Sequence, residues 1–234
     1  MASPVSTGLA TRALPIGQTV RVGTDAEKRA AAEVAAGLVE DGMRVGLGTG
    51  STVAYLLPAL ARRRLSLRCV ATSDRTARAA AELGLAVEPF DGLDRLDIAV
   101  DGADQVAPDG WLVKGGGGAH TREKIVAAAA DRFVVIVDST KPVEVLRPPI
   151  PVELLPFGLQ ATLRRLAPVS LRDAPPSSDG GVIADYTGPV ASPARLSALL
   201  SATPGVVGHG LFDPSLVSDI LIGRGEKVER RTVS

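Results

Sequence analysis

The chain has 234 residues, a length that suits one large domain or a large and a small lobe. Its 26 basic and 26 acidic residues balance, which argues against a general nucleic-acid binder. A single cysteine, Cys69, excludes an intrachain disulfide and a cysteine-based zinc site, and with two histidines no histidine-held metal is expected. No apolar run is long enough to span a bilayer, so no membrane partner is expected.

Residues 1–23 are rich in Ser, Thr, Ala and Gly and lack the apolar core of a signal peptide. We expect a disordered tail or leader there, and the composition also allows a transit segment. From residue 25 onward, helical and strand-like segments alternate. Helices are predicted over 25–40, 51–62, 76–83 and 120–130, and strands over 43–48, 67–71, 85–88, 96–100 and 133–137.

Strands that alternate with helices predict parallel βαβ units, so the fold class is α/β, a Rossmann-like sheet with helices on both faces. Near residue 147 four prolines in RPPIPVELLP are expected to break regular structure. Beyond them the pattern resembles βαββαβ and predicts a smaller α+β lobe. Its predicted helices cover 157–166 and 193–201, and its strands 169–172, 181–186 and 205–211.

The ends DILIG and KVERRTV are strand-like and are expected to return to the main sheet. The predicted division is therefore a catalytic domain of 24–146 plus 212–234 and a small lobe of 147–211. Ligands of such sheets bind beyond the carboxyl ends of the strands. The loops after the predicted strands are thus the first places to look for chemistry.

The first such loop, residues 46–52, has the sequence GLGTGST. Glycines there let the backbone approach a ligand, and the following helix offers free N–H groups to a phosphate. A Walker A loop is excluded because no lysine is present. The dinucleotide fingerprint is disfavoured by Val53 in place of its last glycine, although Asp74 could mimic its ribose-binding acid. The alternative, that this loop is a tight turn that binds no ligand, stays open.

Two carboxylates, Asp101 and Asp104, follow the buried strand 96–100. Three residues apart at a carboxyl end, they can accept hydrogen bonds from sugar hydroxyls or move protons. The alternative is an Asx-type turn with a helix cap.

The segment KGGGGAHTREK, residues 114–124, carries a four-glycine run that is entropically costly to order. Its backbone amides are suited to bind an anion or a developing oxyanion. Only five of the 26 basic residues are lysines, and both Lys114 and Lys141 fall at carboxyl ends. Glu123 lies in the first turn of the predicted helix. It either acts on the substrate or only offsets the helix dipole. His120 is expected to pack.

Together VGLGTGST, DIAVDGADQV, KGGGGAHTREKIVAAAADRFVVIVDSTK and PGVVGHGLF resemble ribose-5-phosphate isomerase, type A. The resemblance runs from about residue 25 to the C-terminus and is strong over 43–146. It implies an aldose–ketose isomerase that interconverts ribose 5-phosphate and ribulose 5-phosphate without metal or organic cofactor. It also implies a cytoplasmic homodimer or homotetramer with a sugar phosphate as its partner.

The resemblance implies roles for single residues. Glu123 is the proton-transferring base, and Asp101, Asp104 and Lys114 share the catalytic site. The implied substrate-binding residues are Thr49, Gly50, Ser51, Thr52, Gly102, Ala103, Gly115, Gly116, Gly117, Lys141 and, less securely, Lys28.

Two residues depart from the family pattern: Gln105 stands where an acid is usual, and His120 where an apolar residue is common. Two other functions stay open at this point, a non-catalytic sugar-phosphate sensor on a related fold and a nicotinamide-dependent oxidoreductase. A sensor would have no need of Glu123 together with Lys114, and Val53 disfavours the oxidoreductase.

Overall fold

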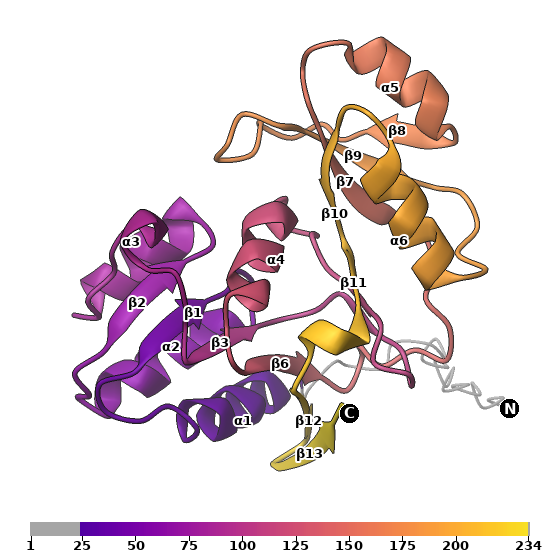
Figure 1. Ribbon diagram of the computed structural model, residues 1–234. Coiled ribbons are helices and arrows are strands. Elements are labelled where there is room, and N and C mark those ends of the chain that lie inside the picture. Colours follow the sequence, from indigo (N-terminus) through magenta and orange to yellow (C-terminus); the bar gives the residue numbers. More distant parts are fainter. Residues whose placement is uncertain (1–23, 234) are drawn as a thin grey trace, which may run out of the picture.

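The computed structural model describes residues 24–233, and the predicted tail at 1–23 lies outside the described residues. Two lobes stand side by side in Figure 1, a larger one built on a mixed sheet and a smaller one that carries α5 and α6. The predicted fold class, a Rossmann-like α/β sheet with an additional α+β lobe, is confirmed.

The sheet of the large lobe has six strands in the order β13-β12-β6-β3-β1-β2. Every neighbouring pair is parallel except β12 and β13, which form an antiparallel hairpin. The strands are β1 (Arg44–Leu47), β2 (Arg68–Ala71), β3 (Ile98–Asp101), β6 (Phe133–Asp138), β12 (Asp219–Arg224) and β13 (Lys227–Thr232).

Helices cover both faces of this sheet. They are α1 (Thr24–Ala36), α2 (Val53–Arg62), α3 (Asp74–Glu82) and α4 (His120–Ala128). Side chains alternate along β6, so Val134 and Ile136 pack with α1 and α2, whereas Val135 and Val137 pack on the face that α4 covers. Burial on both faces explains why FVVIV is apolar without interruption.

The small lobe has a four-stranded antiparallel sheet in the order β10-β7-β9-β8. Its elements follow as β7 (Ile150–Leu154), α5 (Leu159–Leu166), β8 (Val169–Leu171), β9 (Val182–Tyr186), α6 (Pro193–Ala202) and β10 (Val206–His209).

The expectation that the proline-rich stretch breaks regular structure is wrong, because β7 lies inside it, fully buried. Ile150, Val152 and Leu154 enter the small-lobe core, and this burial outweighs the proline signal. Pro151 lies near the start of the strand, where its carbonyl still accepts from Gly210 N–H at 2.7 Å.

The strand predicted over 205–211 is divided between two sheets. After β10 the chain crosses back to the large lobe as β11 (Leu211–Phe212), which joins β4 (Gln105–Val106) and β5 (Leu112–Val113) in a three-stranded sheet. The strand predicted over 85–88 is reduced to one bridge between Cys69 and Val87. The first helix ends at Ala36, four residues before its predicted end, with Gly37 next in the chain.

Candidate active site

The loops that follow β1, β3 and β6 and the loop before α4 surround one cavity at the carboxyl edge of the large sheet. Parallel neighbours place these loops together, as sequence-distant segments of one edge. The lining residues are Thr49, Gly50, Ser51, Thr52, Gly102, Ala103, Asp104, Lys114, Gly115, Gly116, Gly117, Glu123 and Lys141. All of them were predicted site residues.

Asp101 ends β3 and is 3 % exposed, behind the lining residues Gly102 and Lys114, which it contacts. Its Oδ1 accepts from the N–H groups of Thr49 at 3.0 Å and Gly102 at 2.7 Å. Gly48 makes this approach possible, because a Cβ at that position would lie 2.0 Å from the carboxyl group. The glycine of the first loop is therefore required by the Asp101 carboxylate.

Two buried carboxylates share a single ammonium group. Lys114 Nζ lies 2.8 Å from Asp101 Oδ2 and 3.3 Å from Glu123 Oε2, and it also donates to Gly102 O. The side chains of all three residues are at most 4 % exposed. The fully ionised cluster would carry one uncompensated negative charge in a medium of low polarity, which is costly.

The pKa values reflect this imbalance. Burial raises the pKa of Glu123 to about 8; the charge of Asp101 acts in the same direction and Lys114 opposes it. Burial also raises the pKa of Asp101, again against the effect of Lys114. Burial alone would lower the pKa of Lys114, but the two carboxylates outweigh it and raise that pKa. The cluster therefore holds one readily exchanged proton near neutral pH, and the ammonium stays charged.

Asp104 occupies the cavity wall in a different environment from Asp101. It is exposed, and its Oδ2 accepts from Gly116 N–H at 2.8 Å. The glycine loop, residues 115–118, closes with a bond from Gly118 N–H to Gly115 O at 3.0 Å. A Cβ at Gly116 would lie 2.8 Å from Asp104 Oδ1, so the close contact needs a glycine.

The part of the lining that the β1–α2 loop contributes is suited to bind an anion. Gly50, Ser51 and Thr52 precede α2, whose N-terminus offers N–H groups and a favourable dipole. Lys141 lines the same space, and no carboxylate among residues 24–233 forms an ion pair with it. Thr49 differs from its neighbours, because its N–H is taken by Asp101 and its hydroxyl lies 2.8 Å from that of Thr72.

Two predicted site residues do not line the cavity. Asp101 contacts it through Lys114 and the backbone of Thr49, whereas Lys28 has no such contact. Its ammonium is 3.8 Å from Asp25 on the same helix, one turn apart.

The two departures from the family pattern have structural roles. His120 is fully buried, and burial lowers its pKa to about 4, so it is neutral at physiological pH and packs against the glycine loop as expected. Gln105 exchanges two hydrogen bonds of 2.8 Å with the backbone of Arg147. It thereby ties β4 to the segment that leads into the small lobe.

Sequence reasoning missed Arg172. Its guanidinium lies in the small lobe and donates to the carbonyl oxygens of Gly115 and Gly116, which precede it by 57 and 56 residues. No motif surrounds Arg172, and only its place in the fold brings it to the site.

Within residues 24–233, no group of three or more His, Cys, Asp or Glu side chains is arranged to hold a metal ion. The same part of the chain contains no helix with the length and apolar character needed to cross a membrane.

Comparisons with known proteins show one family. Residues 68–227 match the family model of ribose 5-phosphate isomerase A (phosphoriboisomerase A). The ribose-5-phosphate isomerase A of Caulobacter sp. (strain K31) is 46% identical over 219 residues, which cover 87% of this chain and 96% of that protein.

Two solved structures are also similar. The ribose 5 phosphate isomerase A of Neisseria gonorrhoeae is 30% identical with a TM-score of 0.86, covering 90% of this chain and 98% of its own. A D-ribose-5-phosphate isomerase in complex with phospho-erythronic acid is 33% identical with a TM-score of 0.85, covering 90% and 100%. This chain thus belongs to the ribose 5-phosphate isomerase A family.

Proposed function

We propose that this protein interconverts D-ribose 5-phosphate and D-ribulose 5-phosphate through a cis-enediolate, with Glu123 as the group that moves the proton. The observation that carries the proposal is the pair of buried carboxylates, Asp101 and Glu123, around the one ammonium of Lys114. A raised pKa close to the working pH is what a general base that both accepts and returns a proton requires.

The phosphate end of the substrate is bound at Gly50, Ser51 and Thr52 with help from Lys141. The free N–H groups before α2 and the unpaired ammonium support this placement. Holding the phosphate there fixes the reacting carbons against Glu123, which lines the same cavity. A related enzyme has been solved in complex with phospho-erythronic acid, which is itself a phosphorylated ligand.

The reaction follows from these positions. Glu123 removes the proton from the carbon beside the carbonyl and returns it to the neighbouring carbon. Lys114 and the amides of the glycine loop stabilise the negative oxygen that develops in between. Asp104, exposed in the cavity, assists ring opening and hydroxyl proton transfers, and Asp101 holds Lys114. A proton shuttle needs neither an electron acceptor nor a metal ion.

This arrangement distinguishes an enzyme from a sugar-phosphate sensor. A sensor needs the anion site but gains nothing from a second carboxylate buried beside Asp101 and Lys114, because ionising that carboxylate costs stability. A buried carboxylate that lowers stability is expected in an enzyme, where that carboxylate takes part in the reaction.

The test is to incubate chelator-treated protein with ribose 5-phosphate and to measure ketose formation. We expect turnover, unchanged by prolonged chelation. A protein that binds ribose 5-phosphate but forms no ketose would be a sensor, and a loss of turnover that a divalent ion restores would refute the metal-independent reaction.

In Lys141→Ala, affinity for ribose 5-phosphate should fall far more than affinity for ribose. An equal loss of affinity for both ligands would refute the role of Lys141 in phosphate binding.

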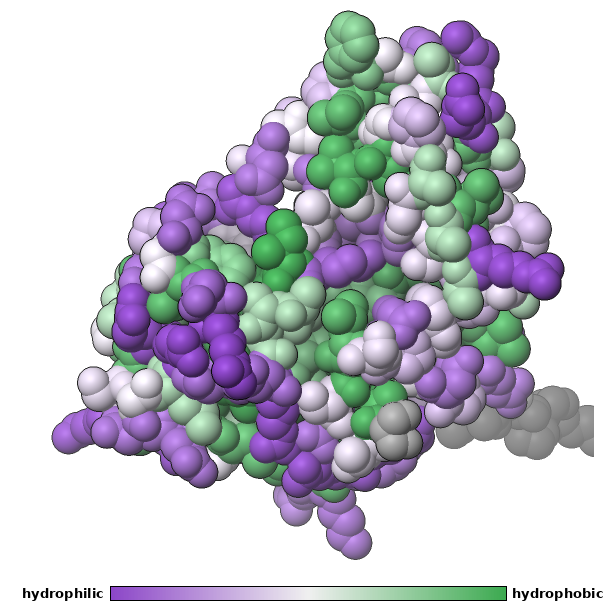
Figure 2. Space-filling model, viewed as in Figure 1, coloured by the Kyte–Doolittle hydropathy of each residue, from purple (hydrophilic) through white to green (hydrophobic). Residues whose placement is uncertain are grey.

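Under the same proposal the enzyme acts in the cytoplasm as a homodimer or homotetramer. Apolar side chains on the surface support self-association: Phe157 is 92 % exposed and Leu199 58 %. On the face shown in Figure 2, apolar side chains gather between the lobes and along the small lobe. Sedimentation of the purified protein measures this directly, and a monomer at micromolar concentration would contradict it.

A further inference from the structure

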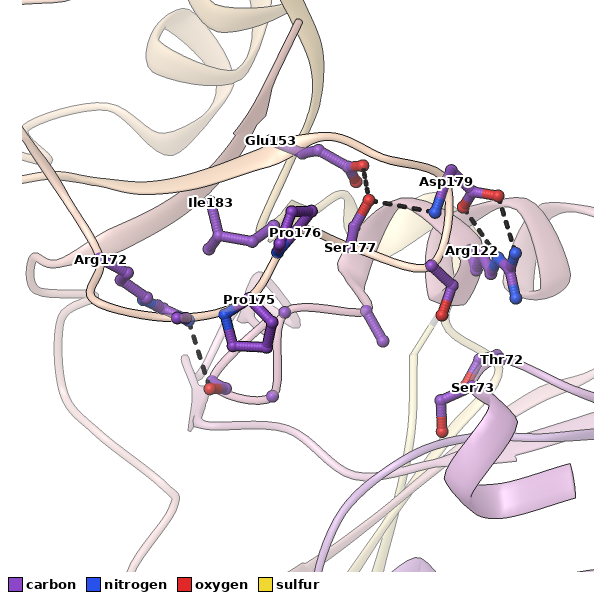
Figure 3. Close-up of a pocket in the computed structure, with 16 residues that line it drawn as sticks. Thr72, Ser73, Arg122, Glu153, Arg172, Pro175, Pro176, Ser177, Asp179 and Ile183 are labelled. Atoms are coloured by element: carbon purple, nitrogen blue, oxygen red, sulfur yellow. Dashed lines mark hydrogen bonds and ion pairs between the residues drawn. The ribbon is translucent and has the colours of Figure 1, made fainter. Parts of the chain in front are cut away.

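The loop between β8 and β9 extends from the small lobe over the glycine loop of the active site. Together with the segment around Thr72 and Ser73, the two loops enclose a second cavity, drawn in Figure 3. Arg172 follows β8 at the start of this loop, and Figure 3 shows its side chain directed at the glycine-loop backbone.

The guanidinium of Arg172 is held in a fixed orientation. Its Nε and Nη2 donate to the two carboxylate oxygens of Asp185 on β9, each at 2.7 Å. This bidentate pair fixes the plane of the guanidinium group. The remaining Nη1 then donates to Gly115 O at 2.8 Å and to Gly116 O at 3.2 Å. The side chain is 21% exposed, so solvent screens these bonds only in part.

The peptide unit between Gly115 and Gly116 links Arg172 to a predicted catalytic carboxylate. Its carbonyl oxygen accepts from Arg172, and its N–H donates to Asp104 Oδ2 at 2.8 Å. Because a trans peptide is planar, its C=O and N–H point in opposite directions. A guanidinium that fixes the carbonyl on one side therefore fixes the direction of the N–H that holds Asp104 on the other.

The next peptide unit has the same geometry. Gly116 O accepts from Arg172, so the N–H of Gly117 points away from the guanidinium. No acceptor for this N–H is present among residues 24–233. Gly117 lies between the two cavities and lines both, whereas Arg172 lines only the second, so an N–H that points away from Arg172 is directed toward the active-site cavity. A cation on the carbonyl also polarises the peptide and makes its N–H a stronger donor. The bond from Gly118 N–H to Gly115 O closes the loop, and Arg172 adds a fixed contact to a glycine run that is otherwise entropically costly to order.

We propose that Arg172 is a positioning residue of the isomerase, which orients the glycine loop so that Gly116 holds Asp104 and Gly117 N–H faces the developing oxyanion. This inference rests on the proposed function of the site. Asp185 is part of the same device, since it orients Arg172.

The test compares Arg172→Ala and Arg172→Lys with Arg164→Ala, a matched control at an exposed position of α5. Both Arg172 variants should lose about 10- to 100-fold in kcat, the cost of a small misplacement of catalytic groups. Their KM for ribose 5-phosphate should change less than threefold, because the phosphate is bound elsewhere. Lysine should not rescue, since it cannot bind Asp185 through two nitrogens and reach both carbonyls. Arg164→Ala should behave as wild type.

Two further measurements separate positioning from general structural damage. Millimolar guanidinium should raise the kcat of Arg172→Ala at least threefold and leave Arg164→Ala unchanged. Hydrogen exchange of the segment 114–119 should increase in both Arg172 variants, a readout that needs no isomerase activity.

Wild-type kcat in Arg172→Ala would overturn the inference, as would a loss that appears wholly in KM. Unchanged hydrogen exchange in the glycine loop would also overturn it. Absence of isomerase activity in the wild-type protein, with the exchange difference present, would instead refute the proposed function.

Discussion

Replacing Glu123 with glutamine tests the proton shuttle most directly. Glutamine keeps the shape and hydrogen-bonding capacity of the side chain but cannot accept the substrate proton. A positioned general base typically contributes about 100- to 10,000-fold in rate, or about 3–5 kcal/mol of transition-state stabilisation. We expect kcat to fall by this factor, while affinity for ribose 5-phosphate changes little because the phosphate lies near Lys141.

The structure also predicts how this substitution affects stability. The pKa of Glu123 rises from 4.5 to about 8 on folding, mainly through burial. The folded state therefore binds more protons than the unfolded state between these values, and stability falls as the pH rises. Full ionisation at alkaline pH would cost up to about 5 kcal/mol at 1.36 kcal/mol per pKa unit. The glutamine variant lacks this cost, so its stability relative to wild type should increase from pH 5 to pH 8.5.

The assay combines turnover, ligand binding and urea unfolding on one purified variant at several pH values. Glu226→Gln, which changes an exposed acid in the turn between β12 and β13, is the matched control and should leave all three quantities unchanged. Near-normal turnover of Glu123→Gln would refute the reasoning and point to Asp101 or Asp104 as the base. A variant less stable than wild type at pH 8.5 would refute the account of the buried charge.

Three other outcomes are expected. Lys114→Met leaves two buried carboxylates without their cation. It should lower the free energy of unfolding at neutral pH by about 3–5 kcal/mol, measured by urea unfolding. An unchanged midpoint of urea unfolding would contradict the sharing of one ammonium by two carboxylates. Gly48→Ala places a Cβ within 2.0 Å of the Asp101 carboxyl group and should cost about 1–3 kcal/mol together with most of the activity. Full activity in that variant would show that Asp101 tolerates displacement. Finally, kcat/KM should rise with pH through an apparent pKa near 8 that belongs to the whole cluster, and a profile flat from pH 6 to 9 would argue against a base of raised pKa.

The sequence by itself determined the large sheet and which loops form the site. The apolar strands and the Ala-rich helices alternate at the spacing of βαβ units, and parallel strands necessarily bring their carboxyl ends to one edge. From this property of parallel strands alone, the β1–α2 loop, Asp101, Asp104 and Lys141 are predicted to lie at one edge of the sheet. The glycine runs indicated close backbone approach, and the contacts at Gly48 and Gly116 explain why.

Only the tertiary structure decided the finer features, because each depends on packing between segments far apart in the chain. Burial of Ile150, Val152 and Leu154 made a strand of a proline-rich stretch. Lys28 pairs with Asp25 on α1 and does not line the cavity. The sharing of Lys114 by Asp101 and Glu123 depends on side-chain distances and burial that spacing does not encode. Arg172 reaches the glycine loop because the small lobe folds back over it, and no local pattern records that contact.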